Sequence, residues 1–324
     1  MRVSDNTTRS AVDEALRRTR SRMEELQMKN ATQKRMLSGA DDPAANTKLM
    51  DIRTQKSVNE QFESNGHMAK TRLTMTETAL SEVYDIFVRA KEIAISQASD
   101  ASANADSRLG VAQEVNALYK QLVAVANRRV GQQYIFGGFK TLETPYDADG
   151  NYNGDMGEIP IEIQKDVFTA ANVPGPHAFE AKKYLPNEQF RNPAAVPEGR
   201  QSAVEKQQVP HLQKLSAFAE LDALRTGLLT SDTETIRGSL DNLDEIIKNV
   251  VTLRAKVSSK VAGIDNAIGQ TAKIDQTNAE LSSQLEDADF AQVYSDLAKE
   301  ETVLRSSLQS AQKLIQPTLL DFLR

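Results

Sequence analysis

The sequence contains no cysteine and no tryptophan, and only 5% of its 324 residues are aromatic. Without cysteine the chain has no disulfide, thiolate metal site or cysteine nucleophile, so its stability must come from packing or assembly. The formal net charge is only −6, with 39 basic and 45 acidic residues mixed along the chain, which leaves no basic surface typical of nucleic-acid binding. We therefore expect protein partners and no nucleic acid.

Long apolar runs are absent as well. No run approaches the roughly 20 residues that cross a bilayer, and the N-terminus has neither the apolar segment nor the cleavage site of a signal peptide. We expect no membrane insertion and no cleaved signal peptide. The arginines within residues 17–22 are bracketed by acidic residues, which favours a solvated or intersubunit helix face over a transit peptide.

Catalytic and metal-binding motifs are missing too. The three histidines, His67, His177 and His211, are far apart in the sequence, and there is no GxSxG or phosphate-binding loop. We predict no enzyme activity, no catalytic residue, no cofactor and no metal site.

One acidic loop resembles part of a calcium site. Residues 149–154 match the first half of an EF-hand loop, but the twelfth position of that register is Pro160, which has no ligating side chain. A register that starts at Asp147 places Tyr152 where the loop requires glycine. Since no helix pair flanks either register, the sequence favours a polar hairpin turn over a calcium site.

Apolar residues at both ends of the chain recur at alternating steps of three and four, the spacing of a coiled-coil seam. Polar Thr19, Asn30 and Gln33 interrupt the N-terminal seam, so that helix would be marginal alone and should order against partners. Intramolecular packing of the two terminal helices is the alternative, and the two interpretations are compatible. The predicted assembly seam consists of Val12, Leu16, Met23 and Leu26 near the N-terminus and Leu297, Leu304, Leu308, Ile315 and Phe322 near the C-terminus.

A helix restart is predicted at Asp41, Asp42 and Pro43. Asp42 can accept hydrogen bonds from free backbone N–H groups, and Pro43 fits the first position of a helix. The apolar rhythm then continues to about residue 98, which predicts a helix roughly 80 Å long at 1.5 Å per residue. Helical spacing resumes from about residue 108 to 130 and again at 236–268, and a last helix is expected from about residue 287 to the end.

The middle of the chain is different in kind. Most of the prolines lie between residues 134 and 210, and Ile159, Ile161 and Ile163 alternate strictly, which predicts a strand with one buried face. Pro160 places this strand at a sheet edge or at a strand start. Residues 180–210 have no consistent period and indicate a loop or an extended segment.

A domain-junction turn is predicted just before this region, at Tyr134, Ile135, Phe136, Gly137 and Gly138. Here Gly131 would help to end the preceding helix. The three apolar residues would cover the end of the helical bundle, and the two glycines would let the backbone turn into the β region. A direct binding site is the alternative interpretation of this motif.

Together these patterns predict a mainly α fold, an elongated helical bundle and coiled coil built from both chain ends with a small inserted β-rich domain. Residues 1–42 and 286–324 would form a terminal coiled-coil domain that serves as the assembly core. Residues 43–133 and 211–285 would form the long helical bundle domain, and residues 134–210 the inserted outer domain.

The motifs resemble the flagellin superfamily and, within it, the hook-filament junction proteins. The stretch "QKRMLSGADDPAA" at 33–45 aligns without a gap on the family pattern GKRxNxPSDDPxA, and departs from it at Gln33, Gly39 and Ala40. Further similar stretches are "YIFGG" at 134–138 and the C-terminal segment that begins "LEDADFAQVYSDLAKEE". The resemblance covers roughly residues 1–135 and 210–324.

This resemblance implies a structural protein of the extracellular bacterial flagellum, secreted by the flagellar type III export route and placed between hook and filament. The implied partners are further copies in a ring, the other hook-associated junction protein on the hook side, flagellin on the filament side and an export chaperone. Flagellin itself is the nearest alternative, although "YIFGG" and the short β insert favour a junction protein. A cytoplasmic coiled-coil scaffold, which would have the heptads without the order of motifs, is the alternative of another class.

Overall fold

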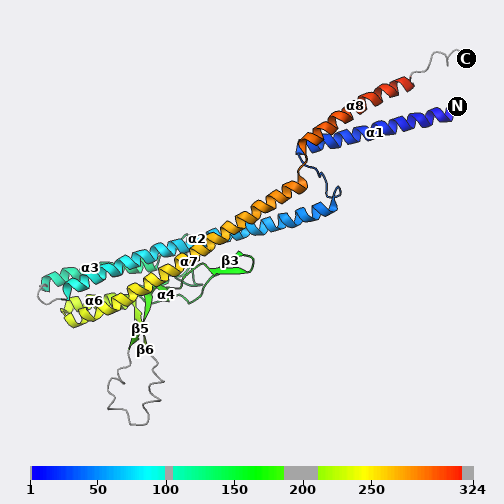
Figure 1. Ribbon diagram of the computed structural model, residues 1–324. Helices are drawn as coiled ribbons and strands as arrows, with labels where there is room; N and C mark the ends of the chain where they lie inside the picture. Colours follow the sequence, from blue (N-terminus) through cyan, green and yellow to red (C-terminus); the bar gives the residue numbers. More distant parts are fainter. Residues whose placement is uncertain (1, 99–104, 186–210, 316–324) are drawn as a thin grey trace, which may run out of the picture. The chain divides into compact units, whose positions relative to one another are not determined.

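The structure is a computed structural model that describes residues 2–98, 105–185 and 211–315 (Figure 1). Most described residues are helical and the strands form small two-stranded antiparallel sheets, which confirms the predicted mainly α fold with a small β-rich part. Predicted seam residue Phe322 and most of the segment 180–210 lie outside the described residues. The elements are α1 (Arg2–Thr32), α2 (Pro43–Gln97), α3 (Ala105–Ala126), β1 (Arg129–Val130), β2 (Gln133–Tyr134), β3 (Pro160–Gln164), β4 (Val167–Ala170), α4 (Gly175–Phe179), β5 (Glu180–Leu185), β6 (His211–Ser216), α6 (Ala217–Thr230), α7 (Thr233–Glu286) and α8 (Phe290–Ile315).

The described chain forms two compact units. Unit 1 comprises residues 1–60 and 272–324, and unit 2 comprises residues 61–271. Both chain ends thus belong to unit 1, while the β elements belong to unit 2. The three-domain division expected from the sequence stays a prediction.

Unit 2 contains the main hydrophobic core. Within it α2 and α7 run antiparallel, tied by the ion pairs Lys70–Asp265 at 2.6 Å, Arg254–Glu77 at 2.8 Å and Lys91–Asp244 at 2.5 Å. Helices α3 and α6 pack against each other. The periodic apolar residues of these helices fill the core, as the three-four spacing predicts. Among the fully buried side chains are Leu73, Leu80, Phe87, Leu122, Leu221, Leu224, Ile236 and Leu243.

The predicted strand exists as β3, which pairs with β4 and begins at Pro160, where a missing N–H is tolerated. Ile163 is buried against the core, and Ile161 is half-buried. Strand β5 starts at Glu180 and pairs with β6, so helical structure resumes at Ala217 and not at residue 211. In Figure 1 these two strands lie below α7 in unit 2.

Helix α3 ends four residues earlier than predicted. The prediction that Gly131 helps to end this helix is wrong, because α3 stops at Ala126 and Gly131 occupies the tight turn between β1 and β2. The side-chain amide of Asn127 exchanges two hydrogen bonds with the backbone of Tyr146, at 2.8 and 3.0 Å, and these tertiary contacts end the helix. Gly131 has a φ of 62°, which suits the first central residue of a two-residue hairpin turn.

The "YIFGG" motif lies where the chain turns away from the bundle. Tyr134, Ile135 and Phe136 are 8%, 2% and 0% exposed. The ring of Phe136 packs edge-on against Phe179, with 5.1 Å between the centroids. Because a Cβ on Gly137 would lie 2.5 Å from the carbonyl oxygen of Lys140, no side chain fits at this turn. This geometry is that of a packed turn on the core of unit 2.

The acidic loop is a self-contained polar turn. Oδ1 of Asp147 accepts hydrogen bonds from the backbone N–H groups of Asp149 and Asn151, at 3.0 and 2.8 Å, and Oδ2 accepts one from the Asn151 side chain. The bond from the Asn151 side chain, together with the backbone bonds, lowers the pKa of Asp147. A bridge between Tyr146 and Tyr152 closes the loop, so the Asp147 carboxylate serves the turn itself.

Candidate assembly site

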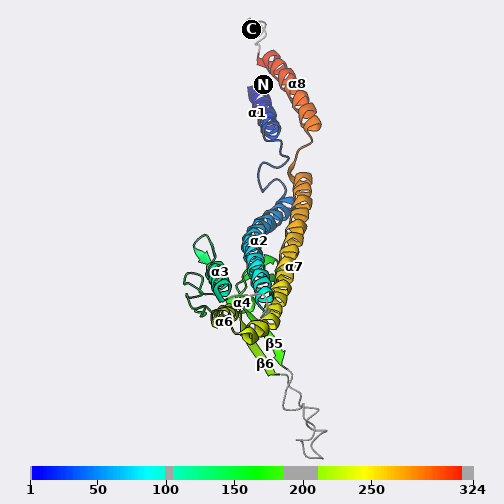
Figure 2. The same ribbon diagram turned by 90° about the vertical axis from the view of Figure 1, so that its left-hand side faces the viewer.

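Helices α1 and α8 form an antiparallel pair within unit 1 and lie side by side in both views (Figures 1 and 2). Nη1 of Arg22 lies 3.7 Å from Oε1 of Glu300 across the pair. On α1 the predicted seam faces α8, because Val12, Leu16, Met23 and Leu26 are all half-buried while the residues between them, except Thr19, are exposed. Polar Thr19 and Asn30 are half-buried at the same interface.

The face of α8 that packs against α1 is rotated around the helix axis relative to the predicted seam. Val293 and Ala311 are buried there, and Leu297 and Leu304 are half-buried. Steps of four and seven residues join these four positions, so Val293 and Ala311 fit the helical spacing of Leu297 and Leu304. Tyr294 is 61% exposed.

The predicted seam residue Leu308, on the other side of this stripe, is 37% exposed and is not covered by α1. Phe290 lies five turns before Leu308 on the same side of the helix and is 59% exposed. The Phe290 and Tyr294 rings stack with 6.4 Å between their centroids. The apolar stripe of α8 is therefore wider than the part of it that α1 covers. Ile315 is the last residue of α8, and its side chain lies outside the described part of the structure.

The helix restart has the geometry that the sequence predicts. Oδ2 of Asp41 accepts hydrogen bonds from the backbone N–H groups of Leu37 and Ser38, at 2.9 and 3.0 Å. These bonds lower the pKa of Asp41. Oδ1 of Asp42 accepts from the N–H of Ala45 at 3.0 Å, and Pro43 is the first residue of α2. The two carboxylates thus organise the segment that connects α1 to α2.

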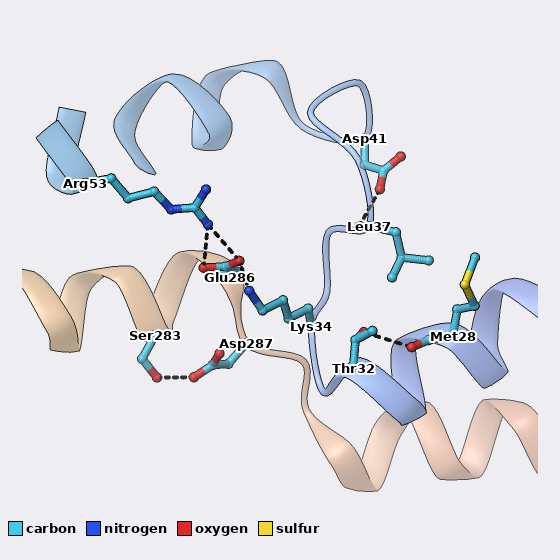
Figure 3. A network of polar contacts seen from close by, with 9 residues as sticks. All are labelled: Met28, Thr32, Lys34, Leu37, Asp41, Arg53, Ser283, Glu286 and Asp287. Atoms are coloured by element: carbon cyan, nitrogen blue, oxygen red, sulfur yellow. Dashed lines mark hydrogen bonds and ion pairs between the residues drawn. The ribbon is translucent and has the colours of Figure 1, made fainter. Parts of the chain in front are cut away.

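Glu286 links this connecting segment to the end of α7 (Figure 3). Its carboxylate accepts from Lys34 Nζ and lies 3.1 and 3.3 Å from Nη2 of Arg53. The Glu286 side chain is only 15% exposed, and the hydrogen bond from Lys34 lowers its pKa. The backbone is paired too, since the Arg35 N–H donates to the Glu286 carbonyl at 2.8 Å and the Ala288 N–H donates to the Gln33 carbonyl at 3.0 Å.

Sequence reasoning missed this Glu286 network. Lys34 and Glu286 are 252 residues apart, and a single carboxylate at the end of a helix has no distinguishing spacing. A hollow of about 360 Å³ lies beside the network, lined in part by Gln33, Lys34, Asp287 and Phe290. Together, the α1–α8 pair, the connecting segment and the network form one site, called the terminal site below.

Neither a metal-binding cluster of acidic, histidine or cysteine residues nor a helix suited to span a membrane occurs within residues 2–98, 105–185 and 211–315.

Comparisons with known proteins agree with the motif order. The family described as the bacterial flagellin N-terminal helical region matches residues 3–141. Flagellar hook-associated protein 3 of Escherichia coli strain K12 is 26% identical over 300 residues, covering 86% of each chain, and the protein of that name from Salmonella typhimurium is 25% identical with the same coverage. The chain is similar to flagellar hook-associated protein 3 over most of its length, and its N-terminal part matches the flagellin N-terminal helical region.

Solved structures share the fold of this chain. A flagellar hook-associated protein from Vibrio parahaemolyticus superimposes with a TM-score of 0.62 at 18% identity, covering 76% of this chain and all of that one. The flagellar junction protein FlgL from Legionella pneumophila gives a TM-score of 0.53 at 17% identity, covering 75% of this chain and all of that one. At these identities the likeness is one of fold.

Proposed function

We propose that this protein is a structural, non-catalytic subunit of the extracellular bacterial flagellum, placed at the junction of hook and filament. The observation that carries the proposal is the match to flagellar hook-associated protein 3 over 86% of the chain. The order of the motifs at both ends and the shared fold support it. In this role the chain would leave the cell by the flagellar type III route without losing a signal peptide.

Ring formation would use the terminal site. Unit 1, which contains this site, has few buried apolar side chains among its described residues, namely Ala45, Leu49, Ile52, Val293 and Ala311. The exposed apolar edge of α8, with Phe290 and Tyr294, would be covered by a neighbouring copy, which supplies the burial that α1 does not. Such a ring would contact the other hook-associated junction protein on one side and flagellin on the other, and an export chaperone would hold the termini before secretion.

A deletion tests the role of the terminal site. Chains that lack residues 1–36 or 290–324 should retain a helical circular dichroism signal, because unit 2 has its own core. They should no longer be incorporated at the hook, and filaments should not grow in strains that carry only these chains. Filament growth in either strain would contradict the proposal.

Localisation separates the alternatives. Immunogold label confined to one band at the end of the hook supports a junction subunit, whereas label along the whole filament would identify a flagellin. Recovery of the intact chain from culture supernatant, and its loss when flagellar export is disabled, would exclude a cytoplasmic coiled-coil scaffold.

A further inference from the structure

Unit 2 carries a hollow of about 390 Å³ between α2 and the β1–β2 hairpin. His67, Met68, Thr71 and Arg72 line it from α2, and Val130 and Gln133 line it from the hairpin. The register pairs Val130 with Gln133, so these two side chains point to the same face of the hairpin. No acidic side chain is among these lining residues.

Arg72 in this hollow forms no ion pair with any of the described residues. Its side chain is half-buried, and its Nη2 atom is buried with no hydrogen-bond partner among the described residues. Burial alone lowers its pKa, since no nearby carboxylate acts on it. Two other arginines of the described helices do have such a partner, since Arg89 bonds Glu114 at 2.8 Å and Arg254 bonds Glu77 at 2.8 Å.

An unpaired, half-buried guanidinium is costly for a folded chain by itself. Its planar array of N–H donors fits a carboxylate, which can accept two parallel hydrogen bonds. The remaining lining suits the stem of an acidic side chain, because Met68 and Val130 supply apolar walls and the Gln133 amide is a further donor. Met68 is 53% exposed, so the apolar wall is open to another molecule.

We propose that this hollow is a socket for an aspartate or glutamate side chain of a neighbouring copy of this chain. The inference rests on the proposed function, which brings copies side by side in a ring. Charge complementarity favours this occupant, since the chain has 45 acidic but only 39 basic residues and therefore offers surplus carboxylates. The socket lies in unit 2, so it adds a contact distinct from the terminal site.

The substitution Arg72→Met tests the socket, because methionine keeps an unbranched stem of similar length while it removes the charge and the donors. The isolated full-length Arg72→Met variant should have a melting temperature equal to or above that of the wild type, since no partner is lost. When the variant and the wild type are co-expressed with different epitope tags, the variant should be about tenfold or more under-represented at hook ends. Arg89→Met, which removes an exposed paired arginine from the same helix, is the control and should compete equally.

Several results would overturn the socket. Equal incorporation of Arg72→Met would show that the site is not used in assembly. A lower melting temperature of the isolated variant would show that Arg72 serves packing or pairs with a carboxylate of its own chain. Stabilisation of the isolated wild type, but not of Arg72→Met, by acetate at millimolar concentration would make a free anion the occupant.

A suppressor screen identifies the partner side chain. Arg72→Glu should abolish incorporation, and suppressors should replace an acidic residue elsewhere on the chain by lysine or arginine. Suppressors that only introduce apolar residues around the hollow would contradict an ion pair. These outcomes differ from failure of the proposed function itself, in which the wild-type chain would be absent from the hook.

Discussion

Gly138 is the most tightly constrained residue of the "YIFGG" turn. Its φ is 71°, and a Cβ at this position would lie 2.2 Å from Oδ1 and 2.3 Å from the carbonyl oxygen of Asp155. The Asp155 carboxylate accepts from the N–H groups of Phe139 and Gly157, at 2.8 and 2.7 Å, so it has little freedom to move. These bonds also lower its pKa.

We predict that Gly138→Ala lowers the free energy of unfolding by about 2 kcal/mol or more, because the new methyl group meets fixed atoms in a left-handed backbone conformation. Chemical denaturation monitored by circular dichroism measures this change. Gly110→Ala is the matched control, since a Cβ there meets nothing within 4 Å in the exposed face of α3. That variant should gain about 0.5–1 kcal/mol from helix propensity, and equal effects of the two substitutions would contradict the argument.

Glu286 should make the terminal site sensitive to acid. Its pKa is lowered mainly by the hydrogen bond from Lys34, so the ionised carboxylate is favoured in the folded state. The stabilisation is therefore present above the ordinary glutamate pKa and is lost as the pH falls through the lowered value. Asp41, whose pKa is also lowered, adds to the same trend.

We predict that Glu286→Gln speeds amide hydrogen exchange at residues 33–42 at neutral pH and weakens its dependence on acid. The glutamine cannot hold Lys34 and Arg53 by charge, although it keeps the length of the side chain. Exchange measured by mass spectrometry at neutral and acidic pH tests this. Glu280→Gln on the same helix is the control, since among the described residues the Glu280 side chain accepts only from the Gln276 side chain. An equal change in that variant would argue against a specific role of Glu286.

At the level of the helices, the uncovered edge of α8 should act in assembly and not in folding. Replacing Phe290 and Tyr294 by serine should leave the melting temperature of the isolated chain within a few degrees, because the rings are 59% and 61% exposed. It should reduce incorporation at the hook in competition with the wild type. Met28→Ser is the control, since Met28 is 58% exposed on the face of α1 opposite its seam; loss of incorporation with this control would mean that any exposed apolar residue of the pair matters.

The helices also show what periodicity can predict. The start of α2 at Pro43 and the spacing of apolar residues in α1 were predictable, because capping residues and steps of three and four residues are local signals. On α8 the spacing identified the apolar stripe, but Val293 and Tyr294 lie only 100° apart around the helix, so the sequence could not tell which side of the stripe α1 covers.

Tertiary contacts explain the other misses. Helix α3 ends at Ala126 because Asn127 pairs with Tyr146, and the Glu286 network joins residues from opposite ends of the chain. Neither interaction has a local sequence signal. The same is true of Arg72, because the lack of a partner for its Nη2 atom among the described residues is a property of the folded surface and not of its neighbours in the sequence.

For the molecule as a whole, the two units differ in how much apolar surface they bury. Unit 2 contains the continuous core of fully buried leucine, isoleucine and phenylalanine side chains. In unit 1, no side chain of α1 whose exposure is described is fully buried, and the seam includes polar Thr19 and Asn30. Local stability follows buried apolar contact, so the α1–α8 pair should open far more often than the core of unit 2.

We therefore predict that amide protons of α1 and α8 exchange at least about tenfold faster than those of α2 and α7 near Leu80 and Leu243 in the isolated chain. Limited proteolysis should cut first within residues 2–32 and 290–315, and leave a resistant fragment that contains unit 2. In hooks that carry the assembled protein, the same segments should become protected, because a neighbouring copy covers the exposed edge of α8. Equal protection of the two units in the isolated chain would mean that the terminal pair is stable alone, and assembly would then have to draw its free energy from other contacts, such as the Arg72 socket.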